Sequence, residues 1–156
     1  MNTISLDSAV AITGVSRSTL IRRVRDGAIT AGEKDASNRT TLALGDVLGL
    51  VSVPLSREDL RVLLQADAGD ATAQADMGAL FYLADADAAA MYWLHKAADQ
   101  DNAEAMHWLG TVCAEADPPD AERAVMWIAR AAALGHPIAQ QQIDALLGAT
   151  LTPGHD

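Results

Sequence analysis

The sequence is poor in cysteine and in aromatic residues. Of its 156 residues, one is a cysteine, Cys113, and six are aromatic. A single cysteine excludes a disulfide framework within the chain, which favours a reducing compartment. The sequence also lacks the uncharged apolar run of about 18 residues that a membrane-spanning helix needs, and residues 1–15 lack the basic leader of a secretory signal. We therefore expect a cytoplasmic protein that does not contact a membrane.

Basic side chains are few and unevenly distributed. Residues 1–50 hold six Lys and Arg against five Asp and Glu, a net charge of +1, whereas residues 62–156 hold three against fourteen, a net charge of −11. Such asymmetry indicates two modules with different partners. It also argues against nucleic acid lying along the second module, because the carboxylates would repel its phosphates.

The patterns that carry catalytic or metal chemistry are missing. The histidines at 95, 107, 136 and 155 do not have metal-ligand spacing. No glycine-rich phosphate loop occurs, and Cys113 has no histidine partner that the sequence reveals. We therefore expect a protein that is not an enzyme and that has no catalytic residues, no metal and no cofactor.

Half of the residues are apolar and alanine is frequent, which favours a globular, mainly α protein. In residues 1–53, serine caps predict one helix over 6–12, after Ser5, and another over 17–25, after Ser16. The second should end at Asp26-Gly27. Residues 28–44 alternate in polarity and contain turn residues, which predicts a hairpin with residues 37–38 at its tip. A short helix is expected over 46–51.

The run VSRSTLIRRVRDGAI at residues 15–29 resembles the recognition helix of the MerR-like and excisionase-like helix-turn-helix families. Residues 8–14, SAVAITG, resemble the first helix and turn of those families. The resemblance covers about 45 residues, and it implies a small winged helix-turn-helix domain over residues 1–53 that binds double-stranded DNA. In these families the hairpin that follows is a wing, whose basic residues touch DNA.

The residues themselves agree with this interpretation. Leu20 and Val24 lie four apart and should face the core, which turns the arginines outward. A capped helix start offers free N–H groups to a phosphate, and nearby Arg and Ser side chains can reach base edges. The expected DNA-binding residues are Ser16, Arg17, Ser18, Thr19, Arg22, Arg23 and Arg25 on the helix, with Lys34 and Arg39 on the wing. The alternative is that these arginines form a solvated face of a protein-contact module.

The wing also carries two carboxylates, Glu33 and Asp35, which weaken its attraction for DNA. A net charge of +1 leaves few phosphate contacts. We therefore expect weak binding by a monomer and stronger binding by a dimer or with a partner.

Two stretches after residue 66 repeat each other. The first positions match at a spacing of 32 residues and the last at 34, which a two-residue insertion near residues 117–120 explains. The matched pairs are Ala71 with Ala103, Ala73 with Ala105, Gly78 with Gly110, Trp93 with Trp127, Ala97 with Ala131 and Ala98 with Ala132. The glycines are expected to allow close helix contact and the tryptophans to lie in the core. Helices are expected over 56–68, 72–83, 88–100, 103–116, 121–134 and 138–147.

This repeat resembles the Sel-one-like repeat, a relative of the tetratricopeptide repeat, over roughly residues 66–147. The resemblance implies antiparallel helix pairs in a right-handed superhelix that binds proteins. Because one helical hairpin cannot bury its own apolar face, stacked hairpins should share a core. We expect an α-helical hairpin solenoid over 54–149, with about two full repeats and flanking half-repeats. Residues 150–156 are expected to be a disordered tail.

The sequence thus predicts a DNA-binding transcriptional regulator whose helical repeats bind a protein partner or a second copy of the chain. Partial repeats leave apolar faces open, so we expect a homodimer with Ile143, Leu146 and Leu147 at the interface. Two alternatives remain. One is an adaptor or anti-regulator that uses both modules for protein contacts, and the other is a sensor that holds a small apolar molecule between repeat helices.

Overall fold

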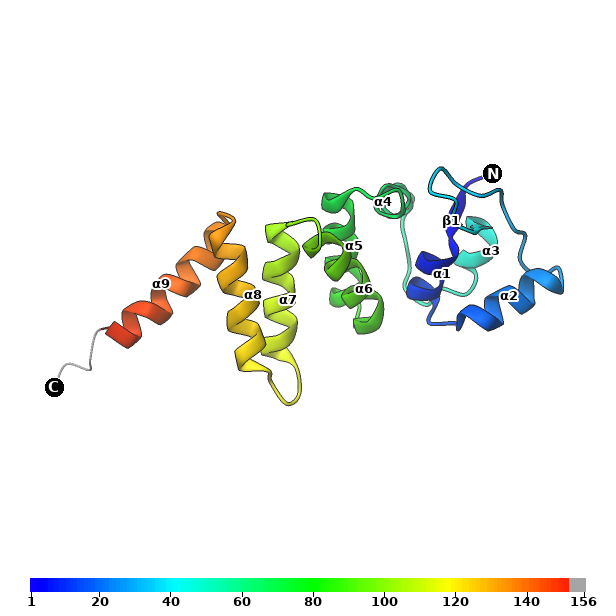
Figure 1. Cartoon of the computed structure of the whole chain (residues 1–156). Coiled ribbons are helices and arrows are strands. Elements are labelled where there is room, and N and C mark those ends of the chain that lie inside the picture. Colours follow the sequence, from blue (N-terminus) through cyan, green and yellow to red (C-terminus); the bar gives the residue numbers. More distant parts are fainter. Residues whose placement is uncertain (152–156) are drawn as a thin grey trace.

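The computed structural model describes residues 1–151, and the side chains through residue 148. It is mainly helical, with 65% helix and a small two-stranded sheet, which confirms the mainly α prediction. The elements are β1 (Thr3–Ser5), α1 (Leu6–Thr13), α2 (Arg17–Arg25), β2 (Thr41–Ala43), α3 (Leu44–Leu48), α4 (Arg57–Asp67), α5 (Ala71–Leu83), α6 (Asp87–Ala98), α7 (Ala103–Glu115), α8 (Ala121–Ala133) and α9 (Pro137–Leu151). The molecule is elongated, with α2 at one end and α9 at the other (Figure 1).

The first two helices begin where the sequence predicts, α2 ends at the predicted residue and α1 ends one residue later than predicted. The Ser5 hydroxyl accepts the Ser8 N–H at 3.2 Å, and the Ser16 hydroxyl accepts the Thr19 N–H at 3.2 Å. α1 ends at Gly14 in the left-handed conformation, with φ of 70°. Serine caps and a glycine stop therefore fix a pair of helices joined by a short turn.

The β structure differs from the prediction. Only Thr41–Ala43 of residues 28–44 form a strand, and they pair antiparallel with β1, placing Ile4 opposite Leu42. The other arm of the expected hairpin contributes an isolated bridge from Ala31 to Leu42. The tip is close to the predicted place, because Asn38 has φ of 59°. The strand Thr3–Ser5 was not predicted, because three residues are too few to show an alternation of apolar and polar side chains. Its partner strand also lies far along the chain.

The short helix α3 spans Leu44–Leu48 rather than the expected residues 46–51, since it starts directly after β2. At the other end, α9 continues to Leu151. The predicted start of a tail at residue 150 is therefore wrong by two residues, and the disorder expected for residues 152–156 lies outside the described residues.

Helices α4 to α9 follow one another as packed neighbours joined by short loops. The α5–α6 and α7–α8 pairs make the most extensive contacts, as the matched repeats imply. Equivalent N-caps recur 32 residues apart: an Asp70 carboxylate oxygen accepts the Ala73 N–H at 2.8 Å, and the Asn102 side-chain oxygen accepts the Ala105 N–H at 2.8 Å. A side-chain cap at each equivalent start sets both hairpins in the same register.

The glycine of each hairpin permits close helix contact, which confirms the prediction. A methyl group added at Gly78 would lie 2.4 Å from Leu94 Cδ2, and one at Gly110 would lie 2.6 Å from Ile128 Cγ1. Leu94 is fully buried, so it has no room to withdraw.

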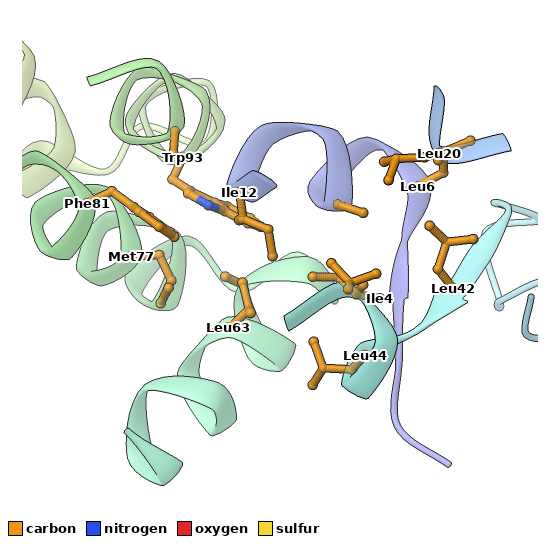
Figure 2. Close-up of a cluster of buried hydrophobic side chains, with 14 of the residues drawn as sticks. Ile4, Leu6, Ile12, Leu20, Leu42, Leu44, Leu63, Met77, Phe81 and Trp93 are labelled. Atoms are coloured by element: carbon orange, nitrogen blue, oxygen red, sulfur yellow. The ribbon is translucent and has the colours of Figure 1, made fainter. Parts of the chain in front are cut away.

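One buried cluster crosses residue 53, the expected boundary between modules. It joins Ile4, Ile12 and Leu20 of the first module with Leu63 of α4, Phe81 of α5 and Trp93 of α6, as Figure 2 shows. Residues 49–55 hold no helix or strand, yet the two sides share this core. A second cluster lies farther along, centred on residues of α6, α7 and α8.

The two matched tryptophans differ in burial. Trp93 is fully buried, as predicted. Trp127 is half-buried, so its expected place in the core is only partly confirmed. The Arg130 guanidinium lies over the Trp127 ring, 4.7 Å from the ring centroid. The repeat equivalence therefore fixes the position in the helix but not the depth of burial.

Replacing Gly78 or Gly110 by alanine should lower the free energy of unfolding. Overpacking of a tight contact costs ~1–3 kcal/mol, which exceeds the ~1 kcal/mol gained in helix propensity. Gly45 of α3 is the matched control, because a methyl group there meets nothing within 4 Å. Urea titration should show lower midpoints for the first two variants and an equal or higher midpoint for Gly45→Ala. An unchanged midpoint for Gly78→Ala would refute the close contact.

Candidate nucleic-acid interface

The outer face of α2 is the candidate interface. Leu20 is fully buried and anchors the helix to the first module. Ser18, Arg22 and Arg25 are exposed and lie three and four residues apart, so they share the opposite face. Ile21 stands beside them and is 42% exposed. α2 projects at one end of the molecule, away from α4 to α9 (Figure 1).

Three arginines of α2 keep their charge unmatched. Within residues 1–148, no carboxylate lies within ion-pair distance of Arg22, Arg23 or Arg25. Arg17 is different, because its guanidinium lies 2.5 Å from an Asp7 carboxylate oxygen of α1. Both side chains are more than half exposed, so this pair contributes little to stability.

The start of α2 is ordered by its own hydroxyl groups. Besides accepting the Thr19 N–H, the Ser16 hydroxyl donates to Thr19 Oγ1 at 2.9 Å. Ser16 and Thr19 therefore position the helix, and the exposed Ser18 has its hydroxyl 3.3 Å from that of Ser16. The remaining N–H groups of the first turn have no partner inside the helix, which is the arrangement that binds a phosphate.

The two basic residues that the sequence places on a wing, Lys34 and Arg39, differ in their surroundings. Lys34 is exposed and donates to Thr40 Oγ1 at 2.8 Å. Arg39 points toward the protein, where its Nε lies 2.7 Å from an Asp35 oxygen and its Nη2 donates to the Asp67 carbonyl at 2.8 Å. Hydrogen bonds from the backbone and side chain of Arg39 lower the pKa of the Asp35 carboxyl, with a smaller contribution from the Ser37 N–H.

Arg39 therefore joins two parts of this chain through hydrogen bonds, although the sequence analysis places it among the DNA-binding residues. Its donors are taken by Asp35 and Asp67, the second of which lies 28 residues away. No local pattern reveals so distant a partner.

Asp67, at the end of α4, is a residue that the sequence did not single out. Its carboxylate accepts the Ser5 N–H at 2.9 Å and the Ser5 and Ser8 hydroxyls at 2.6 Å each, and Arg39 Nη1 lies 3.5 Å away. The side chain is 10% exposed. We call Ser5, Ser8, Arg39 and Asp67 the Asp67 cluster. One signal was present, since a carboxylate in the last turn of a helix opposes the helix dipole.

The expected protein interface lies at the far end of the molecule. Leu146 is 48% exposed, Leu147 is 53% exposed and Ile143 is half-buried. Ile138, at the start of α9, is 55% exposed and extends the apolar surface. These side chains are large and apolar, so a partner would gain by covering them.

Two histidines, His107 and His136, have structural contacts. His136 is buried, its Nδ1 accepts the Ala139 N–H at 3.1 Å and its Nε2 lies 2.7 Å from Glu104, so it caps α9 and ties it to α7. The His107 ring stacks on it at 4.4 Å. In the described part of the chain, no three metal-ligating side chains come together. Burial raises the pKa of the Cys113 thiol, which disfavours the nucleophilic thiolate.

Comparison of the chain with protein-family models, with curated proteins and with solved structures finds no match. Within residues 1–151, none of the helices has the length and apolar character needed to cross a membrane.

The Asp67 cluster generates a stability prediction. Asp67→Asn keeps the size of the side chain but places an amide N–H₂ among donors, so we expect a loss of roughly 2–4 kcal/mol, the scale for breaking a buried charged network. Asp144→Asn, on the exposed surface of α9, is the matched control and should be neutral. Urea unfolding measures both, and an Asp67→Asn protein as stable as the wild type would contradict the role given to this carboxylate.

Proposed function

We propose that the protein is a DNA-binding transcriptional regulator in which α1, the turn and α2 act as a helix-turn-helix and the loop from Thr30 to Thr40 acts as its wing. The observation that carries the proposal is the outer face of α2, where Ser18, Arg22 and Arg25 are exposed and no described carboxylate matches the arginines. The resemblance to MerR-like and excisionase-like domains supports the same assignment.

The dimensions fit a duplex. α2 is an α-helix of nine residues, and the diameter of such a helix with its side chains, about 10–12 Å, suits a major groove about 12 Å wide. In this pose Arg22 and Arg25 meet base edges or phosphates, since a guanidinium pairs well with guanine. Arg23 is half-buried at the edge of the face, where a phosphate is the nearer partner. Lys34 of the wing adds one further phosphate contact.

The number of free cations limits the affinity. Arg22, Arg23, Arg25 and Lys34 allow about four phosphate contacts, which corresponds to a slope of roughly −3 to −4 in a plot of log affinity against log salt concentration. A monomer should therefore bind weakly and a dimer more strongly. The acidic helices α4 to α9 extend away from α2, so they do not obstruct this approach (Figure 1).

We further propose that α4 to α9 form a Sel-one-like helical-repeat scaffold that binds a protein partner or a second copy of the chain. The recurring caps and the matched glycine contacts support the repeat assignment. The exposed apolar side chains of α9 support a partner at that end. The single cysteine supports a cytoplasmic location.

A second candidate is an adaptor without a DNA role. Two of the six basic residues of the first module, Arg17 and Arg39, are already paired with this chain's own carboxylates. Such pairing would suit a surface built for protein contact.

Charge reversal of Arg22 and Arg23 separates the two functions. The Arg22→Glu/Arg23→Glu protein should lose at least about tenfold in affinity for duplex DNA, and its salt slope should shrink by about 2, because two contacts are removed. Arg57→Glu is the matched control, since Arg57 is exposed at the start of α4 and has no ion-pair partner among the described residues. Fluorescence anisotropy with a labelled duplex at several salt concentrations measures both quantities.

If the wild-type protein binds no duplex at low salt, the regulator proposal fails and the adaptor remains. Equal binding by the double variant and the Arg57→Glu control would show that α2 is not the contact surface.

The α9 surface predicts self-association. Sedimentation at micromolar concentration should show a dimer, and Leu147→Glu should shift it toward monomer because the variant places a charge in an apolar interface. Asp144→Asn, on the same helix, should leave the dimer intact. A wild-type protein that sediments only as a monomer would count against the second-copy proposal and leave a different protein as the partner.

A further inference from the structure

A groove lies between the first module and the helical repeats. One wall is a stripe of α1 and its turn, formed by Val10, Ala11 and Gly14, and the other is a stripe of α6, formed by Ala88, Tyr92 and Lys96. Ala88, Tyr92 and Lys96 lie four residues apart and share one face of α6, and Val10 and Gly14 are likewise four residues apart. The groove has a volume of about 490 Å³, within the range of small-molecule sites.

The groove is shallow because several of the residues that line it have small side chains. Ala11, Gly14 and Ala88 reach little into the groove, and a methyl group added at Gly14 would meet nothing within 4 Å. Tyr92 supplies an aromatic face that is held in place. Its hydroxyl lies 3.5 Å from the Ser8 hydroxyl, and its ring packs edge-to-face against the buried Trp93 at 4.9 Å.

The charges at the rim leave one cation unmatched. Asp7 and Arg17 also line the groove, but they pair with each other at 2.5 Å. The Lys96 ammonium lies 5.2 Å from the centre of the Tyr92 ring, and within residues 1–148 no carboxylate lies within ion-pair distance of it. A small apolar groove with an ordered ring and one spare positive charge matches a ligand with an aromatic body and one anionic group.

We propose that this groove binds a small aromatic monocarboxylate, whose ring lies between Val10 of α1 and Tyr92 of α6 and whose carboxylate pairs with Lys96. The ligand would contact α1 and α6 together. It would therefore bridge the first module, which contains α2, and the helices that follow residue 56. Binding at this site does not require DNA, so the proposal stands apart from the proposed function.

Isothermal titration calorimetry with naphthalene-2-carboxylate tests the proposal on the full-length protein. We expect saturable binding at one site. The neutral naphthalene-2-carboxamide should bind about tenfold or more weakly, because it cannot form the charge-assisted contact with Lys96. Lys96→Met should weaken carboxylate binding by a similar factor, whereas Lys34→Met, which removes the only other lysine, should not.

A second variant fills the groove. Ala88 is exposed on α6, so Ala88→Trp should fold and should abolish binding of the carboxylate. Ala133→Trp, on the exposed surface of α8, is the matched control and should bind as the wild type does. Circular dichroism verifies that each variant is folded.

Three results would overturn the proposal: no saturable binding at millimolar carboxylate, equal binding of the carboxylate and the carboxamide, or undiminished binding by a folded Ala88→Trp protein. Loss of DNA binding by itself would leave the proposal intact, and retention of DNA binding would not rescue it.

Discussion

The carboxylate of Asp67 is the interaction on which the arrangement of this molecule depends. A nearly buried charge is tolerated only where several donors surround it, and here the donors come from β1, α1 and the loop before β2. The Asp67 side chain therefore holds β1, α1 and the loop before β2 against the end of α4. The shared apolar cluster around Trp93 surrounds the same junction, so polar and apolar forces hold one geometry (Figure 2).

The geometry of that junction sets the relative positions of the candidate surfaces of the protein. α2 lies at one end, the exposed side chains of α9 lie at the other, and the groove between α1 and α6 lies near the junction. Because α1 leads directly into α2 and packs on α6, a molecule that fills the groove would touch both halves at once. The net charge follows the same division, since the acidic residues concentrate after residue 62, whereas α2 holds four arginines.

Much of the fold could be predicted because its signals are local. Ser5, Ser16 and Gly14 satisfy or end a helix through neighbours within four residues, and the structure has these caps where the sequence predicts them. Gly78 and Gly110 were recognisable from the repeat, since a position that must lack a side chain recurs with the hairpin. The candidate face of α2 was likewise predictable, because helical spacing separates Leu20 from Ser18, Arg22 and Arg25.

The helices, their caps and the separation of charge depend on residues that lie close together along the chain, so they could be predicted without the fold. Three contacts depend instead on how the helices pack: Arg39 turns inward, Thr3–Ser5 pairs with Thr41–Ala43, and the Asp67 carboxylate accepts hydrogen bonds from Ser5 and Ser8. Each of these joins residues 28 or more positions apart. A contact of that kind exists only after the intervening chain has folded, because it is the packing of the helices that brings the partners within hydrogen-bond distance.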